Sequence, residues 1–224
     1  MLDLRAKLEF SRQKLREIRG KVDPSRIYVA WTGGKDSTLV LYLWRELLRS
    51  ASDPGSVHAL NVDTGLKFPE IIRFRDEMNL RWEIDLNIAR PDYDPASYPV
   101  AKDKLKCCTD LKISPLKNAL KELGIRCLIT GIRADEHLSR GKRAYLETDE
   151  IGCFRLNPLL HWTEMDVWSF IWQEGLNYCP LYEQGYRSLG CMPCTHKTDD
   201  PGERSGRDNI KEKQMDVLRS LGYF

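Results

Sequence analysis

Residues 26–37 read RIYVAWTGGKDS, a run of β-branched and aromatic residues that leads straight into a glycine-rich turn. The run has the length and composition of a strand, and residues 37–49 have helical periodicity. In such a strand–turn–helix unit the glycines let backbone N–H groups converge on an anion, and the start of the helix adds partial positive charge. Lys35 adds a full positive charge and Ser37 a hydroxyl donor. Asp36 could cap the helix or help to hold a metal-bound pyrophosphate.

The spacing of this turn separates it from two better-known phosphate loops. It lacks the Gly-x4-Gly-Lys-Ser/Thr pattern of motor proteins and GTPases, and it lacks Gly-x-Gly-x-x-Gly. A Gly-Gly pair alone would favour a turn with a structural role only. Six suitable residues placed between a strand and a helix favour a phosphate site instead.

The alternation of strand and helix continues along the chain. An amphipathic helix is expected over residues 2–20, and it could pack on a second copy of the chain, giving a homodimer, or cover its own sheet. Further strands are predicted at 56–62, 81–86 and 127–130, and helices at 68–78 and 107–123. This order predicts an α/β fold with a doubly wound, mostly parallel sheet, whose ligand lies at the carboxyl ends of the strands.

The pattern changes after residue 160. A helix is expected over 163–174, where Thr163 could cap the first turn and Asp166 falls three residues later. From residue 179 the chain is rich in loops until a charged segment over 209–221. We therefore predict a nucleotide-binding α/β domain over 1–160, preceded by its helix, and a helical and loop extension over 161–224.

Composition narrows the class of protein. The 224 residues are 30% charged and 42% hydrophobic, with no apolar run long enough for a bilayer and no export signal, so a cytoplasmic protein without a membrane partner is expected. The net charge of +2 gives no support to a nucleic-acid partner. A lysine-rich stretch over 102–117 could attract a phosphate backbone, although such a stretch is more often a solvated helix face.

Seven cysteines without an export signal favour metal binding or redox chemistry over disulfides. Two close pairs, Cys107-Cys108 and Cys191-Met-Pro-Cys194, could supply four thiolates to zinc or to an iron–sulfur cluster. Adjacent cysteines suit two corners of a larger cubane better than one small tetrahedral ion. Either pair alone could be a redox dithiol or plain buried cysteines. Cys127 and Cys153 are expected in the core, and the role of Cys179 is left open.

Several of these motifs resemble known families. Residues 32–37 resemble the Ser-Gly-Gly-x-Asp-Ser loop of the adenine-nucleotide α-hydrolase superfamily, with Thr32 in place of the usual serine. Residues 106–120 and 189–195 resemble the [4Fe-4S] site of bacterial and plant-type adenylylsulfate (APS) reductases, and that resemblance implies a cluster on Cys107, Cys108, Cys191 and Cys194. Blocks over 61–70, 129–140 and 157–168 look like those shared by the sulfonucleotide reductases and the small subunit of ATP sulfurylase, whereas the tail GERSGR at 202–207 looks like the sulfurylase subunit.

The resemblance implies an adenine nucleotide as ligand, either ATP, with Mg²⁺, or APS or PAPS. It also implies a sulfur donor or a dithiol reductant protein as partner. Asp63 and Thr64 end a strand, and Arg133 and Arg140 follow Gly131 and carry guanidinium forks suited to phosphate or sulfate. Isolated arginines would more often be surface charges. The predicted nucleotide-binding residues are Thr32, Gly33, Gly34, Lys35, Asp36, Ser37, Asp63, Thr64, Gly131 and Arg133, and the predicted catalytic residues are Lys35, Asp36, Ser37, Arg133 and Arg140.

One departure from the reductases separates the functional hypotheses. Those enzymes carry a C-terminal Glu-Cys-Gly-Leu-His segment whose thiolate attacks sulfur, and this sequence has no cysteine after Cys194. The first hypothesis is therefore activation of an acceptor at the α-phosphate of ATP, followed by sulfur transfer. The second is reduction of APS or PAPS with a thiol from Cys179 or from a partner protein. The third is a sulfurylase-like subunit or nucleotide sensor.

Overall fold

The computed structural model describes residues 3–51, 55–94 and 97–222. Its centre is a six-stranded sheet in the order β3-β2-β1-β4-β6-β5, in which only β5 runs antiparallel to its neighbour. The predicted α/β fold with a mostly parallel sheet is confirmed. The strands are β1 (Ile27–Ala30), β2 (His58–Val62), β3 (Asp85–Ala89), β4 (Cys127–Ile129), β5 (Leu146–Thr148) and β6 (Phe154–Leu156).

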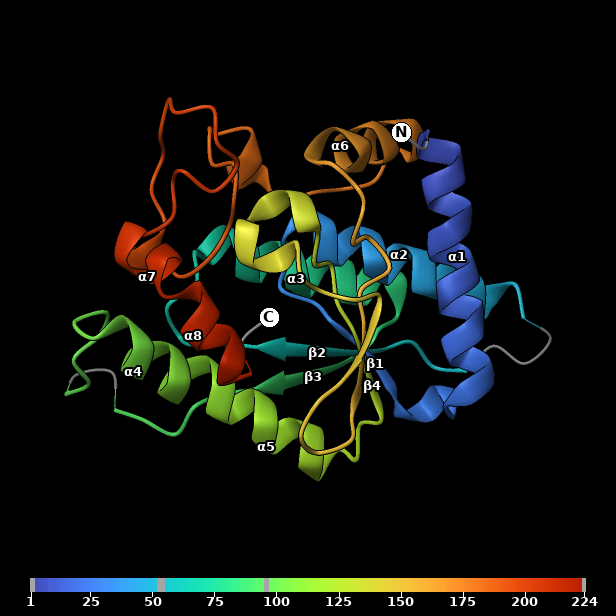
Figure 1. The fold of residues 1–224 in the computed structure, drawn as a ribbon, viewed down its shortest axis with the longest axis horizontal. Helices are drawn as coiled ribbons and strands as arrows, with labels where there is room; N and C mark the ends of the chain where they lie inside the picture. The colour runs from blue at the N-terminus through green and yellow to red at the C-terminus, as the bar shows by residue number, and fades with distance from the viewer. Residues whose placement is uncertain (1–2, 52–54, 95–96, 223–224) are drawn as a thin grey trace.

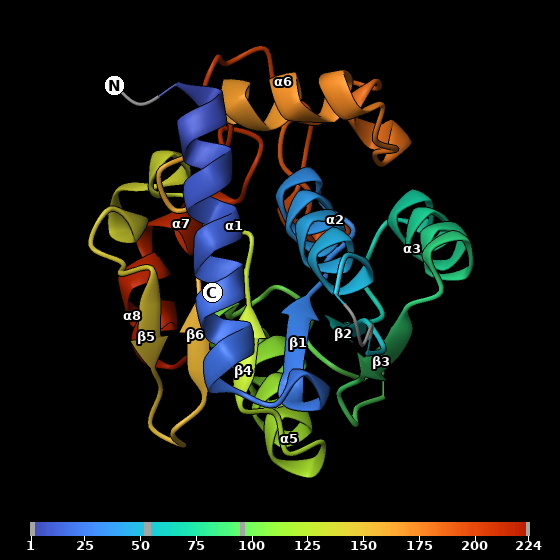
Figure 2. The same cartoon turned by 90° about the vertical axis from the view of Figure 1, so that its right-hand side faces the viewer.

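Alternating side chains of β1 divide the core into two layers. Ile27, Val29 and the following Trp31 pack with α1 (Leu4–Lys21), α2 (Lys35–Arg49), α3 (Pro69–Trp82) and α6 (Glu164–Glu174). Tyr28 and Ala30 point the other way, toward α5 (Ser114–Glu122). Figures 1 and 2 show the sheet between these two layers of helices. Burial of both faces explains why β1 is apolar at every position.

Two strand predictions need correction. The third strand was predicted at 81–86, but α3 continues to Trp82 and Glu83 ends it in the left-handed conformation with φ of 55°, so β3 begins only at Asp85. The hairpin of β5 and β6 was not predicted, because each strand has only three residues and carries little periodic signal. The capping box predicted at α6 is present, since Thr163 N donates to Asp166 at 2.7 Å and Asp166 N donates to Thr163 at 3.2 Å.

The N-terminal helix packs on its own chain. Leu15 and Ile18 of α1 lie in the main core. The buried Ser11 hydroxyl donates to the carbonyl of Pro158 at 2.7 Å and accepts from the Trp162 indole at 3.0 Å. The expected packing of this helix on its own chain is thus present, and packing on a second copy stays a prediction. Within the described ranges, no helix has both the length and the apolar character that a membrane span requires.

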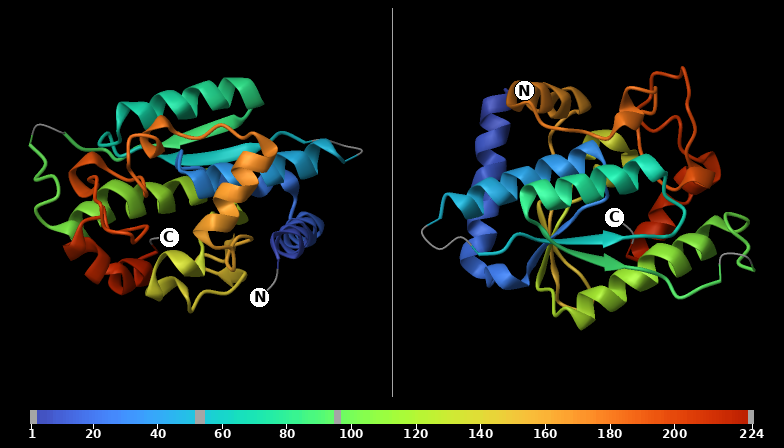
Figure 3. Two further views of the ribbon diagram at one scale, coloured as in Figure 1. Left: turned by 90° about the horizontal axis from the view of Figure 1, so that it is seen from above. Right: turned by 180° about the vertical axis from the view of Figure 1, so that it is seen from behind.

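The C-terminal segments return to the carboxyl end of the sheet. The predicted helix over 107–123 is present as α4 (Lys104–Cys108), a π-helical turn (Thr109–Ile113) and α5. The last helices, α7 (Asn209–Lys213) and α8 (Met215–Ser220), lie beside α4 at this end (Figures 1 and 3). This arrangement brings residues from the far end of the chain to the edge where the parallel strands stop.

Gly131 sets how closely the glycine-rich turn approaches the neighbouring strand. It follows β4, and a Cβ atom added there would lie 2.7 Å from the carbonyl carbon of Asp36 and 2.8 Å from the nitrogen of Ser37. Real Cβ atoms do not come this close to backbone, so only glycine fits without a shift. The first turn of α2 therefore lies directly against the end of β4.

Gly131→Ala should consequently lower the free energy of unfolding by about 1–3 kcal/mol, because the backbone of α2 must move to admit the methyl group. Gly20→Ala is the matched control, since no atom lies within 4 Å of its added Cβ and it lies inside α1. That control should gain about 0.5–1 kcal/mol from helix propensity. Urea unfolding of both variants measures the difference, and equal stability of the two would contradict the close approach.

Candidate functional site

The glycine-rich turn forms the floor of the site. Gly33 has a φ of 84°, which a residue with a side chain rarely adopts. The Ser37 hydroxyl lies 3.0 Å from that of Thr32 and donates to the carbonyl of Gly34 at 3.0 Å. The N–H of Lys35 donates to the hydroxyl of Tyr182 at 2.9 Å. The turn is thus held from within, and one N–H at the start of α2 is covered by a residue from the C-terminal half.

A cavity of about 190 Å³ opens over this turn at the carboxyl ends of β1, β2 and β4. Part of its wall is apolar, formed by Leu60, Val62, Ile71 and Leu116. Seven of the predicted nucleotide-binding and catalytic residues line it, namely Thr32, Gly34, Lys35, Asp36, Ser37, Gly131 and Arg140, and so does the predicted cluster ligand Cys191. Sequence reasoning did not assign the further polar lining residues Lys67, Lys112, Glu136, Tyr182, Ser188, Arg204 and Arg207 to the site.

Four predicted nucleotide-binding residues, Gly33, Asp63, Thr64 and Arg133, are not among the residues that line the cavity. Gly33 faces Ile71. Asp63 pairs with Arg75 at 3.5 Å and Arg90 at 3.7 Å. The buried Thr64 hydroxyl lies 3.3 Å from the sulfur of Cys191, and Arg133 is fully buried next to Asp36. Asp63 and Thr64 thus follow the end of β2, as expected, and the Thr64 hydroxyl contacts a predicted cluster cysteine.

Buried ion pairs surround the turn. Arg133 Nε lies 2.6 Å from Asp36 Oδ1, and Arg133 Nη2 lies 2.5 Å from Glu203 Oε1. The same Glu203 oxygen lies 2.5 Å from Lys35 Nζ. Burial alone would lower the pKa of Lys35, but the nearby Asp36, Tyr182 and Glu203 outweigh this effect and raise the pKa above its ordinary value. The amine therefore stays charged. Asp36 therefore pairs with Arg133, and it does not cap α2, whose cap is Gly34.

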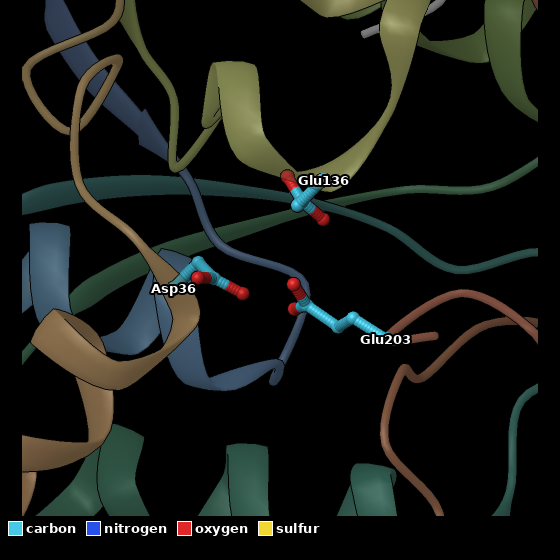
Figure 4. Close-up of side chains that lie close together, drawn as sticks. All are labelled: Asp36, Glu136 and Glu203. Carbon is cyan, nitrogen blue, oxygen red and sulfur yellow. The ribbon is translucent and has the colours of Figure 1, made fainter. Parts of the chain in front are cut away.

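Three carboxylates meet at the centre of this network. Oxygens of Asp36, Glu136 and Glu203 lie within 4.8 Å of one another, and Figure 4 shows them converging from three separate segments. Glu136 contacts Arg140 directly and lies 3.6 Å from Arg204. Burial raises the pKa of Glu136, but Arg140, Arg133 and Arg204 lower it to about 2. Among the residues that the structure describes, these three acids are the group whose oxygens lie close enough to one another to hold a divalent cation.

The four predicted cluster cysteines share a second cavity. Cys107, Cys108, Cys191 and Cys194 all line it, together with Lys112 and Lys211. Cys107 is half-buried and the other three are buried. Burial raises the pKa of Cys191, but Lys112, the Thr64 hydroxyl and Lys211 lower it to about 7. Lys112 and Cys191 line both cavities, so they form a wall shared by the cavity over the glycine-rich turn and the cavity of the four cysteines.

The spacing of the sulfurs bears on the kind of centre. Within the described part of the chain, no three of these sulfurs lie within 4.8 Å of one another. A tetrahedral zinc with Zn–S bonds of about 2.3 Å needs sulfurs roughly 3.8 Å apart. As they lie, the sulfurs therefore do not surround a single tetrahedral ion.

The other three cysteines belong to the core. Cys127 and Cys153 are buried, as predicted. Cys179 is also fully buried, within the main core, and burial raises the pKa of its thiol. A buried thiol with a raised pKa is a poor nucleophile, so the structure does not favour Cys179 as the attacking group.

The residues that sequence reasoning missed had weak signals. Glu203, Arg204 and Arg207 lie in the GERSGR segment, which had been noted for a resemblance but given no role. Lys112 belongs to the lysine-rich stretch, where a solvated face had been favoured. Its position in the wall of both cavities corrects that interpretation for this one lysine.

Acid should weaken the Glu136 cluster in a measurable way. A carboxyl with a pKa of about 2 when folded, against 4.5 otherwise, stabilises the fold above pH 4.5, and this stabilisation is lost as the pH falls toward 2. Between pH 6 and pH 3 the native protein should lose about 2 kcal/mol more stability than Glu136→Gln, which cannot titrate. Urea unfolding at both pH values measures this. The exposed Glu77→Gln should behave like the native protein, and parallel losses in native protein and Glu136→Gln would contradict the ion-pair account.

Comparison with known proteins gives a family match over most of the chain. Residues 26–197 match the model of the phosphoadenosine phosphosulfate reductase domain. An adenosine 5'-phosphosulfate reductase of Pseudomonas aeruginosa is 33% identical over 199 residues, which cover 81% of this chain and 71% of the relative. One from Salinibacter ruber is 33% identical over 162 residues, or 68% of this chain. The match spans only 64% of the Salinibacter protein's own length.

Solved structures share the fold at low identity. Phosphoadenylyl-sulfate reductase from Candida auris superposes with a TM-score of 0.70 at 19% identity, covering 83% of this chain and 90% of that one. FMN adenylyltransferase from Candida glabrata, in complex with FAD and inorganic pyrophosphate, gives 0.74 at 20% identity, covering 88% and 66%. At these identities the likeness is one of fold.

Proposed function

The chain belongs to the phosphoadenosine phosphosulfate reductase family, and from that premise we propose that it binds adenylylsulfate and releases its sulfur as sulfite. The observation that carries this proposal is the wall shared by the two cavities. Lys112 and Cys191 line both the cavity over the glycine-rich turn and the cavity that contains the other three cysteines. A nucleotide held on the turn could therefore place a sulfonate group next to the cysteine site.

The cavity offers groups for each part of such a ligand. The start of α2 and the Ser37 hydroxyl suit the α-phosphate. The apolar wall of Leu60, Val62 and Ile71 suits a flat base. Lys67, Lys112 and Arg207 suit the sulfonate, because they line the same cavity as Cys191 and Lys67 pairs with Cys191 through a β-bridge. Such fixed cations stabilise charge that develops as the S–O bond breaks.

We further propose that Cys107, Cys108, Cys191 and Cys194 hold a [4Fe-4S] cluster. The donor set fits, since all four thiols line one cavity and are spaced too widely for one tetrahedral ion. Lys112 and Lys211 offset the negative charge of the thiolates. When bound, the cluster would supply an extended charge distribution next to the sulfonate.

The attacking thiol in this proposal comes from outside the described residues. Cys179 is buried in the core, and the cluster ligands cannot serve without losing the cluster. An external thiolate would attack sulfur, the S–O bond would break and AMP would leave with the electron pair. A second thiolate would then attack the S-sulfonated thiol, so that a disulfide forms and sulfite is released. The dithiol is oxidised and the sulfonate sulfur is reduced.

Sulfite release tests this proposal. The anaerobically purified protein, supplied with adenylylsulfate and a dithiol, should produce AMP and sulfite in equal amounts. Lys35→Ala should lower kcat/KM about 100-fold, because it removes the buried cation of the phosphate turn. Lys121→Ala, an exposed lysine on α5, is the control and should leave the rate unchanged.

A second candidate function rests on the three carboxylates of Asp36, Glu136 and Glu203. They could hold Mg²⁺ for transfer at the α-phosphate of ATP. Pyrophosphate release from Mg-ATP in the presence of an acceptor, without sulfite from adenylylsulfate or its 3'-phosphorylated form, would favour this candidate over the first.

Iron and sulfide analysis tests the cluster separately. Cys108→Ser and Cys194→Ser should each lose most of the bound iron and acid-labile sulfide, because each removes one of four ligands. Cys153→Ala, which changes a core cysteine outside the site, should keep both. Zinc in place of iron after anaerobic purification, or full iron content in both serine variants, would overturn the assignment.

A further inference from the structure

The hydroxyl of Tyr182 lies over the glycine-rich turn. It accepts the N–H of Lys35 at 2.9 Å, and a Cβ atom added to Gly34 would lie 3.5 Å from the same oxygen. Tyr182 is also one of the residues that line the cavity over the turn. Lys35 is the first residue of α2, so the hydroxyl occupies a backbone donor at a helix start, where an anion is favoured.

The hydroxyl of Tyr182 has an unused donor. A phenol oxygen can accept one hydrogen bond and donate its own hydrogen at the same time. Tyr182 accepts from Lys35, but no group within residues 3–51, 55–94 and 97–222 accepts the phenolic hydrogen. Burial raises the pKa of Tyr182 and outweighs the opposing effect of Lys35, so the hydroxyl keeps this hydrogen. The cavity is thus lined by a protonated donor that lacks an acceptor within these residues.

The ring of Tyr182 is held from several sides. Its backbone belongs to the 3₁₀ turn Pro180–Tyr182, in which Leu181 lies in the main core. The ring of Trp168 packs edge-on against it, with 5.2 Å between the ring centroids. On another side, Lys35 Nζ lies 5.5 Å from the centroid of the Tyr182 ring, as in a cation–π contact. These contacts restrict the ring, so the hydroxyl is positioned before a ligand binds.

We propose that Tyr182 is a nucleotide-binding residue whose hydroxyl donates to the phosphate held on the turn. The hydroxyl stays between the N–H of Lys35 and a phosphate oxygen, accepting from the first and donating to the second. The inference rests on the proposed function in taking the turn as the site of the α-phosphate. It adds to that function a phosphate donor that comes from the C-terminal half of the chain.

The alternative is that a phosphate displaces the hydroxyl and takes the N–H of Lys35 for itself. The two arrangements predict opposite effects when the hydroxyl is removed. Under displacement, removal frees the N–H and tightens phosphate binding. Under donation, removal leaves a gap between the N–H and the phosphate, which weakens binding. The contacts of the ring with Trp168 and Lys35 favour donation, because displacement would have to break them.

Equilibrium binding of AMP and of adenosine to the full chain tests the proposal. Tyr182→Phe keeps the ring but removes the hydroxyl. It should weaken AMP about tenfold and leave adenosine unchanged, because the lost hydrogen bond is one to a charged phosphate. Tyr178→Phe is the matched control. The ring of Tyr178 also packs on Trp168 at 5.2 Å, but its hydroxyl donates to the exposed Glu183 at 3.1 Å, so neither affinity should change.

Three results for Tyr182→Phe would overturn the proposal. Tighter AMP binding would indicate displacement, unchanged AMP binding would remove the hydroxyl from the phosphate site, and equal losses for AMP and adenosine would indicate a general disturbance of the cavity. A crystal structure of the native protein with AMP gives a second test that needs no variant. The Tyr182 oxygen should lie within about 3 Å of a phosphate oxygen and still accept from Lys35, and a separation of more than about 4 Å would refute donation.

AMP binding is measured without turnover, so this inference and the proposed reaction can fail separately. A tenfold loss of AMP affinity in Tyr182→Phe, in a protein whose native form releases no sulfite, would refute the reaction alone. Sulfite release together with unchanged AMP affinity in the variant would refute the role of Tyr182 alone.

Discussion

The close contact between the first turn of α2 and the end of β4 determines the geometry of the whole site. With no side chain at Gly131, the backbone of Asp36 lies against the neighbouring strand. That contact brings Arg133, two residues further on, within 2.6 Å of the Asp36 carboxylate. Arg133 in turn orients Glu203, which completes the surroundings of Lys35. The absence of a side chain at Gly131 thus allows the close packing that brings the buried ion pairs of Lys35, Arg133 and Glu203 together.

The second organising feature is the wall between the two cavities. Lys67 pairs with Cys191 through an antiparallel bridge, and the N–H of Met192 donates to the carbonyl of Leu66 at 2.8 Å. The Cys191–Cys194 loop is therefore anchored to the segment that leaves β2. On the other side, Lys112 lies in the π-helical turn that directly follows the Cys107-Cys108 pair. The cavity over the glycine-rich turn and the four cysteines are thus held next to each other by main-chain contacts, as the proposed reaction requires.

Much of the fold could be predicted from local sequence, because β1, its glycine-rich turn and α2 are contiguous and strongly patterned. The same holds for the core positions of Cys127 and Cys153, which follow from apolar neighbours. The parts that escaped prediction depend on distant contacts. The N–H of Lys35 donates to Tyr182, which lies 147 positions away in the sequence, and its amine donates to Glu203, which lies 168 positions away. Hydrophobic periodicity does not predict contacts between such distant residues. The short strands β5 and β6 form because β6 pairs with the edge of β4 and β5 pairs with β6. A three-residue strand is too short for its sequence pattern to predict this pairing.

The late position of Glu203 in the chain has a consequence for biosynthesis. Domains fold as the chain emerges from the ribosome, from the N-terminus onward. The strands and helices that position Lys35 and Arg133 are complete before residue 203 has been translated, so the nascent sheet carries two inward-facing cations with Asp36 as their nearest acid. Burying such charges without a counter-charge is costly. The arrival of Glu203 therefore completes the neutralisation of both cations, so this part of the core closes only after nearly the whole chain has been made.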